Sequence, residues 1–468
     1  MKDQGMTQVS ADSDLVAARK APVSLLRYFL THGGAATGVK LAAVVLSYLF
    51  LVLLARSVDE AEYGRYGFAI SLAVFLGILA NFGQSMAILR FWPQFQAGDD
   101  PARAKGALLR SYTTVLIGAG AIVGLAFLAV TLAKLMNPGL DAGYLYAAAF
   151  LTFPTAIAAY QSAAMRALGF VARAMLPSDI FHRGFMVLAL LYMIGGGLPL
   201  SAAFVLWISG GLWICFLVPQ AVRIITETRR QAPVGKANLD LPAWRGTSLG
   251  LWGLGVLGIL SQSSDVVVLG LYYGPEETGS YFVALKMASM FVIFFAPTNV
   301  LTAPMISRAF HGGDRDEVQR ICRTICSLMI PPAVCGILIV VFAGDLVLGL
   351  FGPVFAEGHL VFAILSVGFV IQVLSGPSNM LLTMTGHEGK YLRILGTTRI
   401  AMVLAQILLI PLLGPLGAAA GSALGQLALA VWARAFAIRH LRVDPTVLCL
   451  LKSRPRSAAQ PRLDGDQR

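Results

Sequence analysis

Long apolar runs separated by short polar connections cover most of the chain. A helix that spans a bilayer needs ~20 mainly apolar residues, and charged residues, Gly and Pro mark where one run ends and the next begins. We therefore predict an all-α, polytopic membrane protein with about 12 transmembrane helices. Pro154, Pro297, Pro304 and Pro377 lie inside spans and are the expected kink points. The predicted spans are residues 28–55, 64–90, 106–134, 141–165, 174–197, 200–223, 246–273, 278–306, 320–343, 358–384, 391–412 and 416–438.

The composition places these runs in lipid rather than in a soluble core. Hydrophobic residues make up 57% of the 468 residues and charged residues 13%, against ~45–50% and ~25% in soluble proteins. The mean hydropathy is +0.73. A soluble domain with so few charges would expose large apolar patches to water. The first run is longer than the apolar segment of a cleaved signal peptide, so we expect it to remain as a span.

Basic residues are distributed unequally between the two sides. With the N-terminus inside, the predicted inner tails and loops hold 29 Lys and Arg, the outer loops three and the spans four. Cytoplasmic loops are enriched in Lys and Arg, so both termini are expected to be cytoplasmic. This bias accounts for most of the net charge of +12, and it also attracts anionic inner-leaflet lipids. No basic stripe interleaved with aromatic residues occurs on a soluble module, so we expect no nucleic-acid partner.

The two halves of the chain resemble each other. Residues 54–69 resemble residues 269–284 at an offset of 215, which aligns Gly64 with Gly279 and Tyr66 with Tyr281. An even number of spans in each half inserts both copies in the same direction, related by an axis along the membrane normal. Further matches follow in order at offsets of 215–218: Asn81 with Asn299, Arg90 with Arg308, Gly98-Asp99 with Gly313-Asp314, Gly169 with Gly386, and Arg173 with Lys390.

The repeat predicts two six-helix bundles related by pseudo-two-fold symmetry. Rocking two such bundles against each other gives alternating access to a site between them, as in some transporters. An ancient duplication without transport is the plainer alternative. The expected organisation is a cytoplasmic N-terminal tail (1–24), an N-terminal bundle (25–223), a cytoplasmic linker (224–245), a C-terminal bundle (246–440) and a cytoplasmic basic tail (441–468).

No motif in the sequence predicts catalysis, a metal site or a cofactor. Gly386-x2-Gly389-Lys390 has the wrong spacing for a phosphate-binding loop and lacks a following Ser or Thr. The five cysteines form no CxxC pair and have no nearby His. A membrane enzyme that polymerises polysaccharide would need a large outer loop, and the longest one here, residues 344–357, is too short. We therefore predict that the chain is not an enzyme.

Two segments carry a resemblance to a known family. The first span ends in LLAR at residues 53–56 and is followed, after an acidic turn, by EYGRY at residues 62–66. The seventh and eighth spans carry Asp265-x8-Gly274-x4-Gly279-x-Tyr281. Over residues 25–440 the chain resembles the polysaccharide (Wzx-type) flippases for O-antigen and exopolysaccharide. Their superfamily also contains the multidrug antiporters and the lipid II flippases, which usually have fourteen spans.

The resemblance implies a flippase of the bacterial inner membrane. It would move polyprenyl-diphosphate-linked oligosaccharide repeat units by alternating access, for the synthesis of O-antigen, capsule or exopolysaccharide. The candidate partners are this substrate, membrane lipids, a coupling ion (proton or sodium) and the polysaccharide polymerase machinery. The head group would lose its hydration in hydrocarbon, whereas a cationic, water-filled cavity removes that barrier. The alternative is a drug or small-molecule cation antiporter of the same superfamily, which would need isolated acids and few cations.

Polar and charged residues within or at the ends of the spans are the candidates for such a cavity, because ionisable groups in hydrocarbon are costly. Each also has a structural alternative, such as an anchor at a span end or a helix–helix contact. The substrate-binding candidates are Lys40, Asn81, Arg90, Arg183, Lys286, Asn299, Arg308 and Arg399, and the ion-coupling candidates are Asp179, His182 and Asp265.

Two ion pairs are expected among these residues. Asp179 and Arg183 are i,i+4 neighbours on one helix face. Asp265 and Lys286 lie at roughly equal depth, ~12–14 Å below the outer turn of two adjacent antiparallel helices. That second pair would either lock the two helices together or couple substrate release to a proton.

Overall fold

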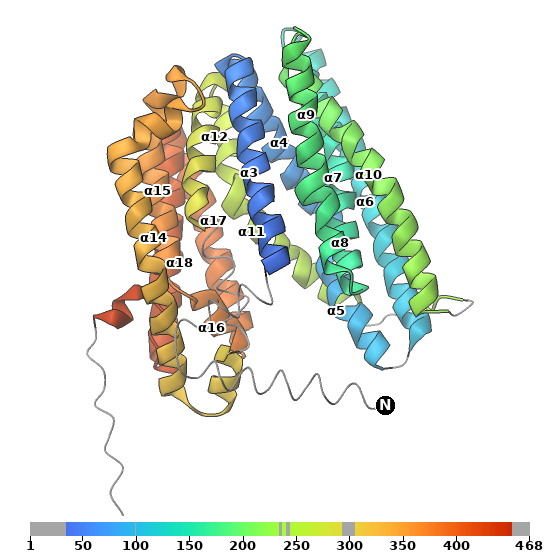
Figure 1. The fold of residues 1–468 in the computed structure, drawn as a ribbon, viewed down its shortest axis with the longest axis vertical. Coiled ribbons are helices and arrows are strands. Elements are labelled where there is room, and N and C mark those ends of the chain that lie inside the picture. The colour runs from blue at the N-terminus through green and yellow to red at the C-terminus, as the bar shows by residue number, and fades with distance from the viewer. Residues whose placement is uncertain (1–33, 99, 234–235, 240–243, 293–304, 452–468) are drawn as a thin grey trace, which may run out of the picture.

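The structure, a computed structural model, describes residues 34–451 except 99, 234–235, 240–243 and 293–304. Its described elements are helices, arranged as two lobes (Figure 1). The N-terminal lobe contains α3 (Gly34–Ser57), α4 (Glu60–Asn81), α5 (Gln84–Ala97), α6 (Pro101–Met136), α7 (Gly143–Ala167), α8 (Val171–Leu176), the π-helix η1 (Pro177–Phe181), α9 (His182–Gly195) and α10 (Ala202–Gln231).

The C-terminal lobe follows the same up-and-down order. It contains α11 (Trp244–Tyr272), α12 (Pro275–Ser289), η2 (Met290–Val292), α14 (Arg315–Gly349), η3 (Pro353–Gly358), α15 (His359–Leu374), α16 (Ser378–Met384), α17 (Glu388–Leu413), α18 (Pro415–Leu441) and η4 (Val447–Leu450).

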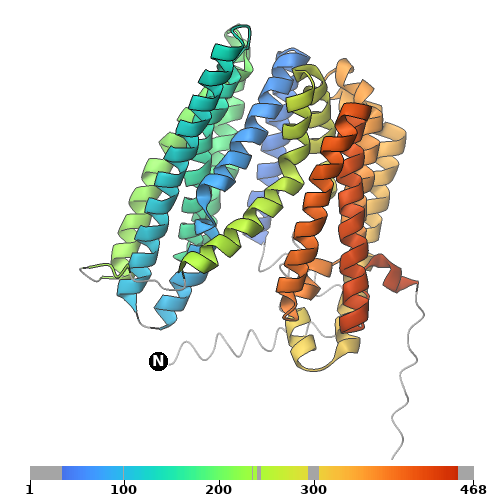
Figure 2. The same cartoon turned by 180° about the vertical axis from the view of Figure 1, so that it is seen from behind.

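The helices run between two ends of the molecule, named here as they stand in Figure 1. The upper end carries the turns after α3 and α11, and the lower end carries the connections after α5 and α10 (Figures 1 and 2). The described helices account for all twelve predicted spans; the first is described from Gly34 and the eighth on either side of residues 293–304. The predicted all-α, multi-pass fold is therefore confirmed.

The length and composition of the helices suit a bilayer. Eight described segments are long and apolar enough to cross a membrane, and α11, which bends by 60° between Leu260 and Gln262, would make nine. Large apolar side chains point outward from both lobes, among them Ile117 at 73% exposure and Phe342 at 82%. Such surfaces are stable only against lipid or another apolar partner.

The second predicted span is two helices rather than one. α4 ends at Asn81 because Phe82 and Gly83 adopt left-handed backbone conformations, with φ of 47° and 73°. A Cβ on Gly83 would lie 2.3 Å from the carbonyl oxygen of Ser248, so glycine lets α11 pack against the break. The indole of Trp252 donates to the carbonyl of Leu79 at 3.1 Å, which satisfies a backbone group near the end of α4.

Two other spans are also interrupted. The π-helix η1 joins α8 to α9 in the fifth span, and α15 and α16 are separated in the tenth by Gly376, at φ 59°, and Pro377. The expected kink at Pro377 thus coincides with a break, whereas Pro154 lies within a continuous α7. Pro297 and Pro304 lie outside the described residues.

The hydrophobic core is organised differently at the two ends. At the upper end a single cluster joins both lobes and includes Leu54, Tyr63, Phe282 and Phe351. At the lower end each lobe has its own cluster among the described residues. α11 runs diagonally between the lobes, from a buried Trp244 against the N-terminal lobe to its upper end in the C-terminal lobe (Figure 2). Apart from the start of α11, the described parts of the lobes therefore share a core only toward the upper end.

The contact between α4 and α12 is reciprocal. A Cβ on Gly64 would lie 1.5 Å from the carbonyl oxygen of Pro275, and a Cβ on Gly279 would lie 2.8 Å from that of Glu60. At the repeat offset of 215, Glu60 corresponds to Pro275 and Gly64 to Gly279, so the two contacts are equivalent. An interface in which each partner contributes the same two positions, each contacting the other, is isologous, and it places a two-fold axis between the partners. Because α4 and α12 both run downward from the upper end, this axis lies along the helices, as the predicted repeat requires.

Candidate substrate and ion-coupling site

Two of the predicted cations lie at the boundary between the lobes. Nη1 of Arg183, on α9, donates to the carbonyl of Ala43 on α3 at 2.7 Å. Nζ of Lys286, on α12, lies 5.0 Å from the ring centroid of Phe282, a favourable cation–π contact. The charge of Asp265 acts most strongly on Lys286, and the like charge of Arg183 acts on it more weakly. Two cations from different lobes therefore lie near one another.

Helix α3 connects these two cations. It packs on α9 of the N-terminal lobe, yet Tyr48 Oη donates to the carbonyl of Lys286 at 2.6 Å and Arg56 Nε donates to the carbonyl of Leu350 at 2.7 Å. Lys40 lies on the same helix, one turn before Ala43, and its side chain is outside the described part. Figure 1 shows α3 in front of the junction between the lobes.

The predicted pair of Asp265 and Lys286 is not formed. Oδ2 of Asp265 instead accepts from Tyr281 Oη at 2.9 Å and from Ser422 Oγ at 3.3 Å, and Oδ1 accepts from the N–H of Val266. The prediction considered depth alone and ignored the direction in which each side chain leaves its helix. Asp265 is 3% exposed inside the C-terminal lobe, while Lys286 points toward Phe282.

A chain of hydrogen bonds extends from Asp265 through the C-terminal lobe. Ser422 accepts from Gln406 Nε2 at 2.9 Å, and Gln406 Oε1 accepts from Ser264 Oγ at 3.0 Å. Gln406, on α17, is fully buried, so this chain ties α11, α17 and α18 together. A buried polar network of this kind is stabilising only when its members are paired.

Arg399 lies next to this network without a carboxylate partner among the described residues. It is 3% exposed; Nη2 donates to Gln426 Oε1 at 3.2 Å, and Nε has no hydrogen-bond partner there. Gln426 and Ser422 are one turn apart on α18. Both line a small cavity of about 10 Å³ together with Asp265, which is room for about one water molecule. A buried acid and the amide that holds a buried guanidinium therefore face one cavity.

The polar patch of the fifth span is arranged as predicted for two of its three residues. Nη2 of Arg183 lies 3.7 Å from Oδ1 of Asp179, which confirms the i,i+4 pair. His182 points elsewhere: its Nε2 lies 3.1 Å from Ser209 Oγ, and its ring stacks on Trp213 at 4.3 Å between centroids. His182 therefore joins α9 to α10 rather than contributing to the pair.

The remaining candidates lie toward the lower end. Asn81 is buried at the break of the second span, where its side chain accepts from the N–H of Ser85 at 2.9 Å. Arg90 is exposed with its guanidinium 5.8 Å from the Phe91 ring centroid, and Arg308 is also exposed. Asn299 lies outside the described residues.

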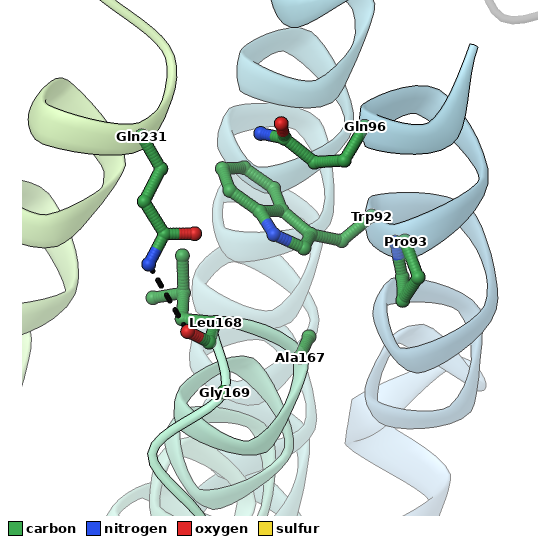
Figure 3. A pocket seen from close by; sticks show the side chains of 7 residues that line it. All are labelled: Trp92, Pro93, Gln96, Ala167, Leu168, Gly169 and Gln231. Atoms are coloured by element: carbon green, nitrogen blue, oxygen red, sulfur yellow. Dashed lines mark hydrogen bonds between the residues drawn. The ribbon is translucent and has the colours of Figure 1, made fainter. Parts of the chain in front are cut away.

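A second cavity, which the sequence pattern did not predict, opens at the lower end of the N-terminal lobe. It measures about 500 Å³, is open to the outside, and lies between the end of α5, the turn after α7 and the end of α10 (Figure 3). Gln231 Nε2 donates to the carbonyl of Leu168 at 3.0 Å, while Nε2 of Gln96 is buried without a described partner. Gln231, on α10, could not be associated with Trp92 and Gln96, on α5, because sequence spacing does not show which helices meet.

No group of three or more His, Cys, Asp or Glu side chains within the described ranges could hold a metal ion. The buried charged residues among those described are the acids Asp179, Asp265 and Asp444 and the arginine Arg399, while Arg183 and Lys286 are half-buried at the lobe boundary.

The fold is that of the MOP-superfamily transporters. The chain is similar to an inward-facing multidrug resistance MATE family transporter, with a TM-score of 0.60 and 15% identity over 87% of this chain and 99% of that one. It is similar to an outward-facing MATE family transporter with a TM-score of 0.58 and 14% identity, over 90% and 96%. A MOP superfamily transporter from Pyrococcus furiosus, described as having a binding pocket of reverse polarity, gives a TM-score of 0.57 and 15% identity, over 89% and 95%.

A family model of polysaccharide biosynthesis proteins matches residues 30–310, which is more than half of the chain. The chain belongs to this family of polysaccharide biosynthesis proteins. None of the curated proteins compared with it matches.

Proposed function

We propose that the chain is a flippase that moves polyprenyl-diphosphate-linked oligosaccharide repeat units across the bacterial inner membrane, with both termini in the cytoplasm. The observation that carries this proposal is the position of Arg183 and Lys286, one cation from each lobe, at the lobe boundary next to α3. Their described counter-charges are the carboxylates of Asp179, 3.7 Å from Arg183, and of Asp265, which acts on Lys286 without a direct ion pair. A diphosphate offers several charged oxygens that both cations could bind. Membership of the polysaccharide biosynthesis family supports a glycan-linked substrate.

Alternating access would follow from the two-lobed fold. Apart from Trp244 at the start of α11, the lower clusters of the two lobes are separate, which supports a state in which the lobes are apart at the lower end, the proposed cytoplasmic side. The substrate head group would enter there, bind Arg183 and Lys286, and leave when the lobes rock. Lys40, on α3, is a further candidate cation for this site.

Ion coupling would be located at Asp265. Its carboxylate is buried, and the cavity beside it also contains Gln426, which binds Arg399. Binding of a proton or sodium at Asp265 changes the net charge of the C-terminal lobe, which can couple the ion gradient to the movement of the lobe. We expect the polymerase that extends the flipped units to act on the product at the opposite face of the membrane.

Reconstitution of the protein into liposomes tests this function. The substrate would be a polyprenyl-diphosphate-linked oligosaccharide with a fluorescent sugar, placed in both leaflets. Dithionite quenches the fluorescent sugars on the outer leaflet, so the extent of quenching measures how much substrate has reached that leaflet. Each charge-assisted hydrogen bond to the diphosphate is worth ~1.5–3 kcal/mol, so Arg183→Gln with Lys286→Gln should slow flipping at least about tenfold. The exposed pair Arg173→Gln with Lys390→Gln, at repeat-related positions of the lower end, is the matched control.

A drug antiporter is the second candidate function, since multidrug transporters share this fold. Such an antiporter would export organic cations, which the cations at the lobe boundary would repel. Ethidium export without flipping of the lipid-linked sugar in the same liposomes would overturn the proposed function in favour of this one.

A further inference from the structure

The closest approach between the two halves of the chain occurs at two glycines. A Cβ on Gly64 would lie 1.5 Å from the carbonyl oxygen of Pro275 and 3.0 Å from the nitrogen of Gly279. A Cβ on Gly279 would lie 3.1 Å from the nitrogen of Gly64. Real side chains do not tolerate separations near 1.5 Å, so α4 and α12 can touch here only because both residues lack a side chain.

This glycine contact stands within the upper cluster, where the lobes share a core. Around it, Ser280 Oγ donates to Glu60 Oε1, Tyr63 packs against Phe282 with centroids 6.0 Å apart, and Arg56 binds the carbonyl of Leu350. These contacts are hydrogen bonds and ring packing between helix surfaces. They can separate as a unit without breaking any helix.

We infer that Gly64 and Gly279 form a gate at the upper end, and that a side chain at either position shifts the protein toward the state in which the upper end is open. The inference rests on the proposed alternating access, in which the end that is closed in one state must open in the other. At the lower end, the start of α11 is the described part of the C-terminal lobe that joins the core of the N-terminal lobe, through Trp244, and the remaining residues of the two lower clusters stay separate. The state observed is therefore the one in which the glycine gate is closed.

The distances predict a graded effect. Gly64→Ala places its Cβ against backbone that cannot move aside, whereas Gly279→Ala meets Glu60 at 2.8 Å and needs a smaller shift. Overpacking of this kind typically costs more than ~1.4 kcal/mol, a tenfold change in an equilibrium constant. We expect Gly64→Ala to lower the ratio of gate-closed to gate-open molecules at least about tenfold, and Gly279→Ala to lower it less.

Spin-label distances in the full-length protein in nanodiscs measure this ratio without any substrate. One label pair, Met136→Cys with Leu412→Cys, reports on the upper end, and a second, Arg230→Cys with Arg439→Cys, reports on the lower end; these four positions are exposed. The exposed Cys215 and Cys335 are replaced by alanine in every variant. Gly120→Ala, on α6 with nothing within 4 Å of its added Cβ, controls for the higher helix propensity of alanine.

In Gly64→Ala we expect a longer distance between the two labels at the upper end and a shorter distance between the two labels at the lower end. Both label distances should be unchanged in Gly120→Ala. Unchanged distances at both ends in a folded Gly64→Ala protein would overturn the gate. If Gly64→Ala does not fold, the same distances are measured in Gly279→Ala, where we expect changes in the same directions but smaller in size.

A reversible lock tests the gate from the other direction. Cysteines at Glu60 and Ser280, whose side chains are in contact, would be joined by copper phenanthroline, and the disulfide would be reduced with dithiothreitol. The locked protein should keep the long lower distance and lose flipping, and reduction should restore flipping. Full flipping by the locked protein would overturn the gate. If the distances respond to Gly64→Ala but the parent flips no lipid-linked sugar, the gate stands and the proposed function fails.

Discussion

Asp265 is the most deeply buried acid for which the structure gives a complete set of partners. Tyr281, Ser422 and the backbone of Val266 donate to it. A neutral carboxyl keeps one full acceptor oxygen, and the hydroxyls of Tyr281 and Ser422 can rotate to accept from its O–H instead of donating. The carboxylate can therefore be neutralised while its neighbours keep their hydrogen bonds. An acid that can exchange a proton at little structural cost is what ion coupling requires.

This leads to a prediction for Asp265→Asn. The amide keeps an oxygen acceptor in place, so we expect the free energy of unfolding to change by less than ~1.5 kcal/mol. Flipping in liposomes should continue but lose its stimulation by an imposed pH or sodium gradient. Thermal unfolding in detergent and the liposome assay measure the two effects, with the exposed Asp316→Asn as control. Gradient stimulation equal to that of the parent would remove Asp265 from the coupling step.

Asp444 gives a second prediction at the residue scale. It follows α18 and accepts from Nη2 of Arg434 at 2.8 Å and from Oγ1 of Thr446 at 2.7 Å, while its N–H donates to Gln319. Burial alone would raise the pKa of Asp444, but the hydrogen bonds from Arg434 and Thr446 outweigh it and hold the pKa below its usual range.

Because the folded-state pKa is the lower one, the stabilisation by Asp444 is present above the unfolded-state pKa of ~3.9 and is lost as pH falls through the folded value. Asp444→Asn should lower the free energy of unfolding by ~1–2 kcal/mol at pH 6, with the difference from the parent shrinking toward pH 2–3. Chemical unfolding in detergent at a series of pH values measures this. Asp100→Asn, which removes an exposed pair with Arg103, should have little effect. A constant difference at all pH values would contradict the linkage.

At the scale of elements, the hydrophobic pattern predicted which segments are helical better than it predicted where they break. Spans were recognised because charges and turns bound them, as at Asp59 and Gly274. The break at Phe82–Gly83 was missed because it depends on Ser248 and Trp252, more than 160 residues away. For the same reason, sequence spacing paired Asp179 with Arg183 on one helix but failed for Asp265 and Lys286 on two helices. Local periodicity determines which residues share a face of one helix, whereas the packing of helices determines which residues of another helix that face contacts.

The break itself can be tested. Gly83 has φ of 73°, and its added Cβ would meet the carbonyl of Ser248 at 2.3 Å. A left-handed backbone costs a residue with a side chain ~1–2 kcal/mol, and the clash adds to this, so Gly83→Ala should lower the free energy of unfolding by at least ~2 kcal/mol. Gly124→Ala, in α6 with nothing within 4 Å, should be neutral or stabilising. Thermal unfolding of both purified variants measures these effects. A melting temperature of Gly83→Ala equal to that of the parent would mean that contact with α11 does not stabilise the break.

For the molecule as a whole, the repeat proved more informative than any single motif. Gly64 and Gly279 were aligned by a loose sequence match, and in the structure they meet at the contact between α4 and α12. Glycines at a pseudo-two-fold axis explain why the match includes both positions: each copy needs the other to lack a side chain. The cations at the lobe boundary are less symmetric, since Arg183 and Lys286 come from unrelated spans of the two lobes. Their proximity could not be derived from the repeat.

The orientation of the whole molecule in the membrane gives the last prediction. Lower-end segments carry most of the basic residues, whereas the upper turns carry acids such as Asp59, Glu60 and Asp141. Lys and Arg near span ends oppose translocation, so the lower end should face the cytoplasm. A membrane-impermeant maleimide should label Met136→Cys, at the upper end, in intact spheroplasts. Arg230→Cys, at the lower end, should react only in inside-out vesicles, with Cys215 and Cys335 replaced by alanine in both variants. The reverse pattern would place the glycine contact at the cytoplasmic side, so that a molecule with this contact closed would open to the outside and could not receive a substrate made in the cytoplasm.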